Sequence, residues 1–243
     1  MLDGGIQLVA VTGTINAIVS LAIAWRIYIS YQKLKSAAQE YFMKFYLHFG
    51  IFYLAFATSQ LLFIDASGAI PVGIFHVVSY FFLYLSIGYM MGFPFLLSNK
   101  ERTARKILFF VLLFNIAFLA GRIVSFEPSV RELFDQYAYW RPVFPEWMRV
   151  VTGVYAVLAA GLASFLFIGH GIQNREDVFV VRRSFWLGSG IAILMFASIF
   201  AFIAAPSGSF WMVVVATFLV LAGLLVIMRG VFYKKDMARV PVV

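Results

Sequence analysis

The stretch SFEPSVRELFDQYAYWRPVFPEWMR, residues Ser125–Arg149, is the only long polar interval in a chain that is otherwise a succession of apolar runs. It holds four of the eleven acidic residues and seven aromatic residues. Four apolar runs precede it and three follow it. The number and order of these runs around Ser125–Arg149 decide the predicted fold.

The composition of the chain indicates that its solvent is a lipid bilayer. Of the 243 residues, 63% are hydrophobic and 12% are charged, against about 25% charged in a typical soluble domain. A soluble fold of this length cannot bury so much apolar surface. The net charge of +8 is therefore interpreted as contact with anionic lipid, and nucleic acid is not expected as a partner.

Seven segments are long and apolar enough to be spans, because a transmembrane helix needs roughly 20 mainly apolar residues. None carries Lys, Arg, Asp or Glu in its middle third. Residues 1–243 are therefore predicted to form one all-α domain, a polytopic integral membrane protein with seven transmembrane helices. The predicted spans are Ile6–Ile29, Phe45–Ile64, Ile70–Leu97, Ile107–Val124, Val150–Ile168, Phe185–Ala205 and Phe210–Val231.

Basic residues predict the orientation of these spans. Fifteen Lys and Arg residues fall in one set of intervals, and the other set has only four, Arg122, Arg131, Arg141 and Arg149. Because cytoplasmic loops carry the excess of Lys and Arg, the N-terminus is predicted outside and the C-terminus inside. The first residues lack the basic segment of a cleaved signal peptide, so the first run is expected to remain as a span. Short loops and small size favour the cytoplasmic (inner) membrane of a prokaryote.

Ser125–Arg149 is then predicted to be an extracytoplasmic interfacial loop with a short amphipathic helix, in which Pro128 occupies the first turn. Tyr137, Trp140 and Trp147 fit the aromatic belt at a membrane–water interface. Two interpretations stay open. The segment is either an interfacial anchor with solvated charges or a lid over a cavity in the bundle.

Polar side chains gather in the predicted outer halves of the spans. His76, Tyr80 and Tyr84 recur every four residues, which places them on one face of the third span. Since polar residues in a span usually point into the bundle, they are candidates for the wall of a cavity. The alternative is a packed aromatic stripe in which His76 bonds to a neighbouring helix. The candidate ligand-binding residues are Gln60, His76, Tyr80, Tyr84, Asn115, Arg122 and Tyr155.

No pattern for catalysis, metal or cofactor binding is found in the sequence. Cysteine is absent, and the three histidines form no HxxxH or HExxH spacing, so no metal ligand set is predicted. The last span lacks the lysine that a retinal protein requires. The sequence therefore predicts no cofactor and no enzymatic activity.

The predicted orientation places two basic intervals on the inner side of the membrane, Lys100–Lys106 and Arg182–Arg183. Each of their charges is worth about 1 kcal/mol against the anionic lipids of the inner leaflet. A docking site for an acidic cytoplasmic signalling partner is the alternative.

The whole chain resembles the seven-helix sensor modules at the front of some bacterial signalling proteins, such as sensor kinases. The resemblance lies in the order of helices, the outside N-terminus, the four-plus-three split and segments such as VRRSFWLGSGIAIL (Val181–Leu194). It implies an output domain at the C-terminus, which the ten residues after Tyr233 are too few to form. Signalling by this chain alone is therefore not expected.

These observations lead to three hypotheses. The first is a non-enzymatic, receptor-like membrane sensor with a pocket for a small apolar or anionic molecule in the outer half of the bundle. The second is a small-solute transporter with a three-plus-one-plus-three arrangement of helices. The third is a structural subunit of a membrane complex.

Overall fold

The computed structural model of the chain describes residues 5–63, 68–97, 100–143, 145–204 and 209–233. Within them lie seven helices that are long and apolar enough to cross a membrane. A π-helix, η2 (Ile199–Ala204), continues the sixth of them. The seven helices are α1 (Leu8–Leu34), α2 (Ala37–Leu62), α3 (Ala69–Leu97), α4 (Glu101–Val124), α5 (Glu146–Gln173), α6 (Val178–Ser198) and α7 (Phe210–Val231).

The predicted number and order of helices are confirmed. Several helices extend beyond the predicted spans at the end of the bundle where α1 finishes. Helix α2 begins at Ala37 instead of Phe45, and α5 continues to Gln173. The added turns contain Gln, Glu and Lys residues, which form helix readily outside an apolar environment. The two short predicted intervals, Asp65–Ala69 and Pro206–Ser209, lie for the most part outside the described residues.

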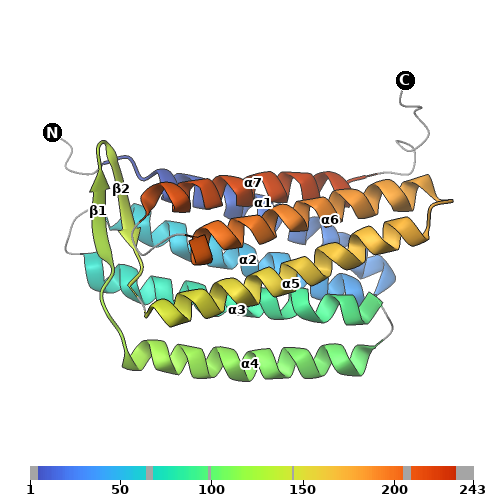
Figure 1. Cartoon of the computed structure of the whole chain (residues 1–243), viewed down its shortest axis with the longest axis horizontal. Coiled ribbons are helices and arrows are strands. Elements are labelled where there is room, and N and C mark those ends of the chain that lie inside the picture. Colours follow the sequence, from blue (N-terminus) through green and yellow to red (C-terminus); the bar gives the residue numbers. More distant parts are fainter. Residues whose placement is uncertain (1–4, 64–67, 98–99, 144, 205–208, 234–243) are drawn as a thin grey trace.

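Six helices form a closed ring, and α4 lies outside it (Figure 1). Each helix of the ring packs against the next in the order α1, α2, α3, α5, α6, α7, and α7 packs back against α1. Helix α4 packs on α3 and has the smallest buried share of the seven described helices. The main hydrophobic core lines the inside of the ring and takes side chains from all six of its helices.

Buried polar groups join α1 to α7 and close the ring. The hydroxyl oxygens of Thr12 and Thr217 lie 3.2 Å apart. Asn16 donates its Nδ2 hydrogen to the backbone carbonyl oxygen of Thr217 over 3.2 Å. Polar contacts of this kind add modest stability between apolar helices and select one pairing.

The segment between α4 and α5 is a β-hairpin, so the predicted short amphipathic helix is wrong. Strands β1 (Val130–Phe134) and β2 (Tyr137–Arg141) pair antiparallel, with Val130 opposite Arg141. The turn places Asp135 at φ 52°, a left-handed conformation that Asp adopts more easily than most residues. Ile6 pairs in parallel with Tyr137, on the other side of β2 from β1.

The physical reason for the hairpin lies in β2. Ala138, Tyr139 and Trp140 are consecutive and all buried. Since successive side chains of a strand point to opposite faces, both faces of β2 are covered here. The aromatic side chains of Tyr139 and Trp140 also favour strand over helix.

The hairpin lies across one end of the ring, where α1 begins (Figure 1); this end is called the hairpin end. Trp140 Nε1 donates to the carbonyl oxygen of Phe63, after the end of α2, over 2.7 Å. Ser129, which precedes β1, bonds through its Oγ to His76 Nδ1 of α3 over 2.9 Å. The hairpin is therefore fixed to the ring by specific contacts with α2 and α3.

Candidate functional site

A cavity of about 310 Å³ lies inside the ring and reaches the hairpin end. Its size is at the lower limit of typical small-molecule pockets, about 300–1,000 Å³. Helices α2, α3, α5, α6 and α7, η2 and the hairpin segment all contribute to its wall. The helical wall residues are Phe45, Phe49, Phe52, Tyr53, Phe56, Tyr80, Leu83, Ser86, Ile87, Met90, Ala156, Ala160, Leu194, Ala197, Ser198, Ala201, Phe202, Val213, Ala216, Thr217 and Val220.

The cavity is largely apolar, although five residues of its helical wall carry a hydroxyl group: Tyr53, Tyr80, Ser86, Ser198 and Thr217. Ser86 donates its hydroxyl hydrogen to the carbonyl oxygen of Leu83 over 2.9 Å. Ser198 and Thr217 make the same kind of bond within their own helices, at 3.0 and 2.8 Å. Because the hydroxyl hydrogens of Ser86, Ser198 and Thr217 are donated to the backbone, these three groups can only accept a hydrogen bond from a ligand.

An aromatic cluster lies beyond the deep end of the cavity. The rings of Phe42, Phe93 and Phe167, from α2, α3 and α5, have centroids 5.0 to 5.8 Å apart. Phe42 lies about one turn past the wall residue Phe45, and Phe93 about one turn past Met90, both away from the hairpin end. We call Phe42, Phe93 and Phe167 the aromatic floor; they separate the cavity from the far end of the bundle.

The rim of the cavity at the hairpin end is charged. It is formed by Arg141, Pro142, Glu146, Arg149 and Ser209. Arg149 Nη2 lies 3.1 Å from Glu146 Oε1, and the exposed fractions of the two side chains are 13% and 78%. The Arg149 guanidinium is therefore shielded from water while its carboxylate partner is largely in water.

The other rim arginine is held more firmly. Arg141 Nε lies 2.5 Å from Glu132 Oε1, across the two strands of the hairpin, and both side chains are mostly buried. Tyr139, next to the rim on β2, also lines the cavity. Burial raises the pKa of the Tyr139 phenol, so it stays a neutral hydroxyl group at physiological pH.

Among the predicted ligand-binding residues, Tyr80 lines the cavity. Its ring packs against Phe52 of α2 and Phe202 of η2, with centroids 6.0 and 6.3 Å apart. Gln60 and His76 are buried near the hairpin end but do not line the cavity. The ring of His76 stacks on Phe56, at a centroid distance of 4.9 Å.

The remaining predicted residues lie where α3, α4 and α5 meet. Tyr84 hydrogen-bonds through its hydroxyl to Thr152 Oγ1. Asn115 donates to the carbonyl oxygen of Phe81 over 3.0 Å, and the ring of Tyr155 packs near that of Tyr84. These residues join the outlying α4 and the adjacent α5 to α3, and the structure does not bring them to the cavity.

Arg122 and the predicted lid residues have structural contacts. Arg122 donates through Nη2 to the carbonyl oxygen of Val143 over 2.8 Å, which fixes the chain between β2 and α5. Tyr137 stacks on Phe210 at 5.9 Å. Trp140 is buried, whereas Trp147 is 60% exposed. The hairpin residues that line the cavity are Tyr139 and Arg141, which flank Trp140 in the sequence.

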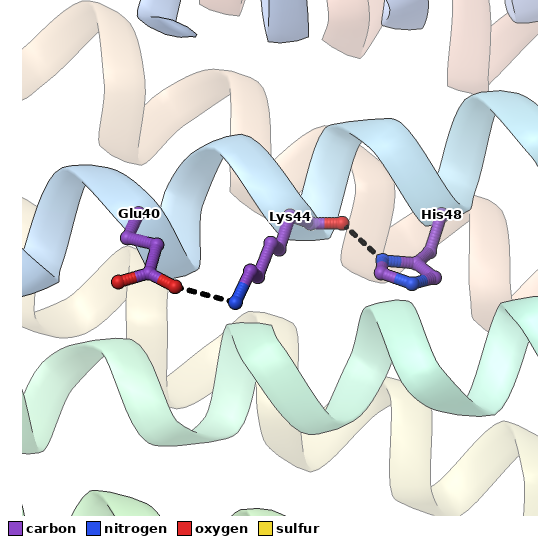
Figure 2. Close-up of polar contacts among 3 residues, drawn as sticks. All are labelled: Glu40, Lys44 and His48. Atoms are coloured by element: carbon purple, nitrogen blue, oxygen red, sulfur yellow. Dashed lines mark hydrogen bonds and ion pairs between the residues drawn. The ribbon is translucent and has the colours of Figure 1, made fainter. Parts of the chain in front are cut away.

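A second group of polar residues lies toward the opposite end of the bundle. Figure 2 shows Glu40, Lys44 and His48 along one side of α2, where Lys44 pairs with Glu40 and its carbonyl oxygen accepts from His48 Nδ1 over 2.6 Å. The His48 ring stacks on Tyr89 of α3 at 5.3 Å. None of the three lines the cavity, so this group is separate from the candidate site.

Comparison with known proteins and a search for metal sites give no further assignment. No protein-family model matches the chain, and no curated protein matches it. Among the described residues, no group of three or more His, Asp or Glu side chains could hold a metal ion. The cavity, its charged rim and its aromatic floor are therefore the features from which a function is inferred.

Proposed function

We propose that the chain is a multi-pass integral membrane protein and a non-enzymatic, receptor-like sensor that binds a small molecule in the cavity of its helix ring. The main observation in support of this proposal is a largely apolar cavity of about 310 Å³ with a charged rim under the hairpin. Such a combination, an apolar body with a few polar groups at one side, is the usual form of a small-molecule site.

The proposed orientation places the hairpin end outside and the opposite end in the cytoplasm. It is supported by the distribution of fifteen basic residues on one side and four on the other, because Lys and Arg are enriched in cytoplasmic loops. The cavity then opens to the outside of an inner membrane. The intervals Lys100–Lys106 and Arg182–Arg183 face anionic lipid or a cytoplasmic partner.

Sensing also requires a part of the fold that can respond to the ligand. The π-helix η2 supplies Ala201 and Phe202 to the cavity wall. π-Helical segments are rare and occur frequently at functional sites. Helix α6 continues from η2 to the opposite end of the bundle, where Arg182 and Arg183 lie. In this proposal a ligand against Phe202 changes the packing of η2, and α6 transmits the change.

The experiment compares the protein in lipid nanodiscs with a variant whose cavity is filled. Ala160→Leu adds volume at a wall position of α5, and Ala117→Leu adds the same volume at an exposed position of α4. Small apolar and amphiphilic compounds are screened for thermal stabilisation and for slower hydrogen exchange at Ile199–Ala204. We expect to find compounds that stabilise the natural chain and Ala117→Leu but do not stabilise Ala160→Leu. A screen in which every active compound acts equally on both variants would contradict the proposal.

A transporter is the second candidate, and the order of the ring favours it. Helices α1, α2, α3 and helices α5, α6, α7 form two triplets of the same packing order, with α4 outside both. The triplets meet at α3 with α5 and at α7 with α1, which is the arrangement of two parallel repeats around a central site. The aromatic floor would then be the inner gate.

Solute flux distinguishes the two candidates. The protein is reconstituted in vesicles, and uptake of a compound that binds the cavity is followed in the natural chain and in Ala160→Leu. A sensor gives binding without flux in the natural chain. Saturable uptake by the natural chain, abolished by Ala160→Leu, would favour the transporter instead.

A further inference from the structure

We infer that the ligand of the cavity is a small amphiphile with an anionic head group, whose apolar tail fills the deep part and whose head contacts Arg149 at the rim. This inference rests on the proposed function, since it names the chemical class of the molecule that the cavity binds. The broader expectation is an apolar or anionic ligand. The inferred ligand is both: its apolar part lies deep in the cavity and its anionic part lies at the rim.

The volume sets the length of the tail. The cavity of about 310 Å³ lies at the lower limit of small-molecule pockets, about 300–1,000 Å³. A medium-length chain with a small head fits this limit. A full phospholipid does not.

The wall of the deep part excludes a polar tail. Phe49, Ile87 and Met90 form it together with Ala160 of α5. The hydroxyl group of Ser86 already donates its hydrogen to a backbone carbonyl oxygen. A polar group placed here would lose its hydrogen bonds to water without replacement, which is strongly unfavourable.

The rim favours an anion over a cation. Arg149 is 13% exposed, and its partner Glu146 is 78% exposed, so the carboxylate of Glu146 can turn to water and leave the guanidinium to a ligand. Arg141 stays paired with Glu132 and keeps its charge at the rim. A carboxylate bound to Arg149 makes charge-assisted hydrogen bonds, which are stronger than neutral ones.

The backbone supports the same charge preference. Glu146 and Arg149 belong to the first turn of α5, and Ser209 is the N-cap of α7, with no hydrogen bond from its side chain to the helix. Helix N-termini carry partial positive charge. Two of them lie at the rim beside Arg141 and Arg149, so the backbone adds positive potential to two arginines that are each paired with a glutamate.

The experiment uses three probes of equal chain length at neutral pH: octanoate, octanol and octylamine. The protein is studied in nanodiscs of zwitterionic lipid, and binding is followed by thermal stabilisation as a function of probe concentration. The variant Arg149→Gln removes the proposed head-group contact. The matched control Arg105→Gln removes an arginine that is also paired with a glutamate at 3.1 Å, on α4 at the opposite end. Ala160→Leu fills the cavity.

We expect octanoate to bind the natural chain more tightly than octanol or octylamine. Arg149→Gln should weaken octanoate about tenfold or more, the loss expected for a charge-assisted hydrogen bond, and leave octanol within about twofold. Arg105→Gln should change neither the affinity for octanoate nor the affinity for octanol. If Arg149→Gln fails to fold, Arg149→Lys keeps the charge without the planar fork and should weaken octanoate by a smaller factor.

The outcomes separate this inference from the proposed function. Equal binding of all three probes, lost in Ala160→Leu, would overturn the anionic head and leave the binding cavity standing. Preferential binding of octylamine would overturn it too. Stabilisation that is the same in Ala160→Leu and in the natural chain would overturn both, because the probes would then act through the lipid.

Discussion

Gly190 of α6 and Gly223 of α7 face each other so closely that a Cβ atom on either would lie 2.9 Å from the backbone carbonyl oxygen of the other. Small residues allow helix backbones to approach in this way, and the approach increases their van der Waals contact. The α6–α7 joint of the ring therefore requires glycine at both positions. Because Thr217 of α7 also bonds to α1, this joint sets the position of the helix that closes the ring.

We expect Gly223→Ala to destabilise the protein by about 1–3 kcal/mol, the usual cost of adding a methyl group to a tightly packed contact. The new Cβ meets backbone on its neighbour, and backbone cannot move aside as a flexible side chain can. Unfolding in a denaturing detergent mixture, followed by circular dichroism, measures the change. Gly169→Ala is the matched control, since nothing lies within 4 Å of its new Cβ. Equal stability of the two variants would contradict the close contact.

The attachment of the hairpin gives a second prediction. Trp140→Phe keeps most of the buried ring but removes the hydrogen bond to the carbonyl oxygen of Phe63. This bond is partly buried, and losing a typical hydrogen bond costs about 0.5–1.5 kcal/mol. We expect lower stability and faster hydrogen exchange in β2. Trp147→Phe, at a position that is 60% exposed, should have little effect; if both variants exchange alike, the Trp140 bond does not hold the hairpin.

The seven helices could be predicted because each is an apolar run long enough to span a bilayer, and that signal is local. The hairpin could not be predicted in the same way. Its strands are five residues each, too short for a clear period, and Pro128 also suits a first helical turn. The burial of Ala138, Tyr139 and Trp140 depends on tertiary contacts, including the pairing of Ile6 with β2, which the local sequence does not reveal.

The candidate site shows the same limit. Tyr80 could be found because a polar side chain in an apolar helix stands out, but the same signal selected Tyr84 and Asn115, whose partners are on α5 and α3. Sequence does not reveal which face of a helix meets a cavity and which meets a neighbour. The phenylalanines of α2 that line the cavity have the spacing of ordinary core residues, so no sequence signal distinguished them.

The difference between these two tyrosines yields a third prediction. Tyr84→Phe removes the hydrogen bond to Thr152 between α3 and α5, and we expect a loss of stability of about 0.5–1.5 kcal/mol. Because Tyr84 does not line the cavity, stabilisation of this variant by octanoate should match that of the natural chain. Tyr80→Ala, which enlarges the cavity, should change the stabilisation by octanoate. A loss of the octanoate response in Tyr84→Phe would return Tyr84 to the binding site.

The orientation in the membrane gives the last prediction, and the absence of cysteine from the chain makes it direct to test. Asp135→Cys places one thiol in the turn of the hairpin, and Glu176→Cys places one in the exposed turn between α5 and α6. The proposed orientation puts the first outside the cell and the second in the cytoplasm. In intact bacterial cells that express each variant, a membrane-impermeant maleimide should label Asp135→Cys, and Glu176→Cys should react only after the cells are opened. The unsubstituted chain controls for background labelling. The reverse pattern would invert the orientation and place the cavity mouth in the cytoplasm. Labelling of both thiols in intact cells would mean that the two ends of the bundle are not separated by a membrane.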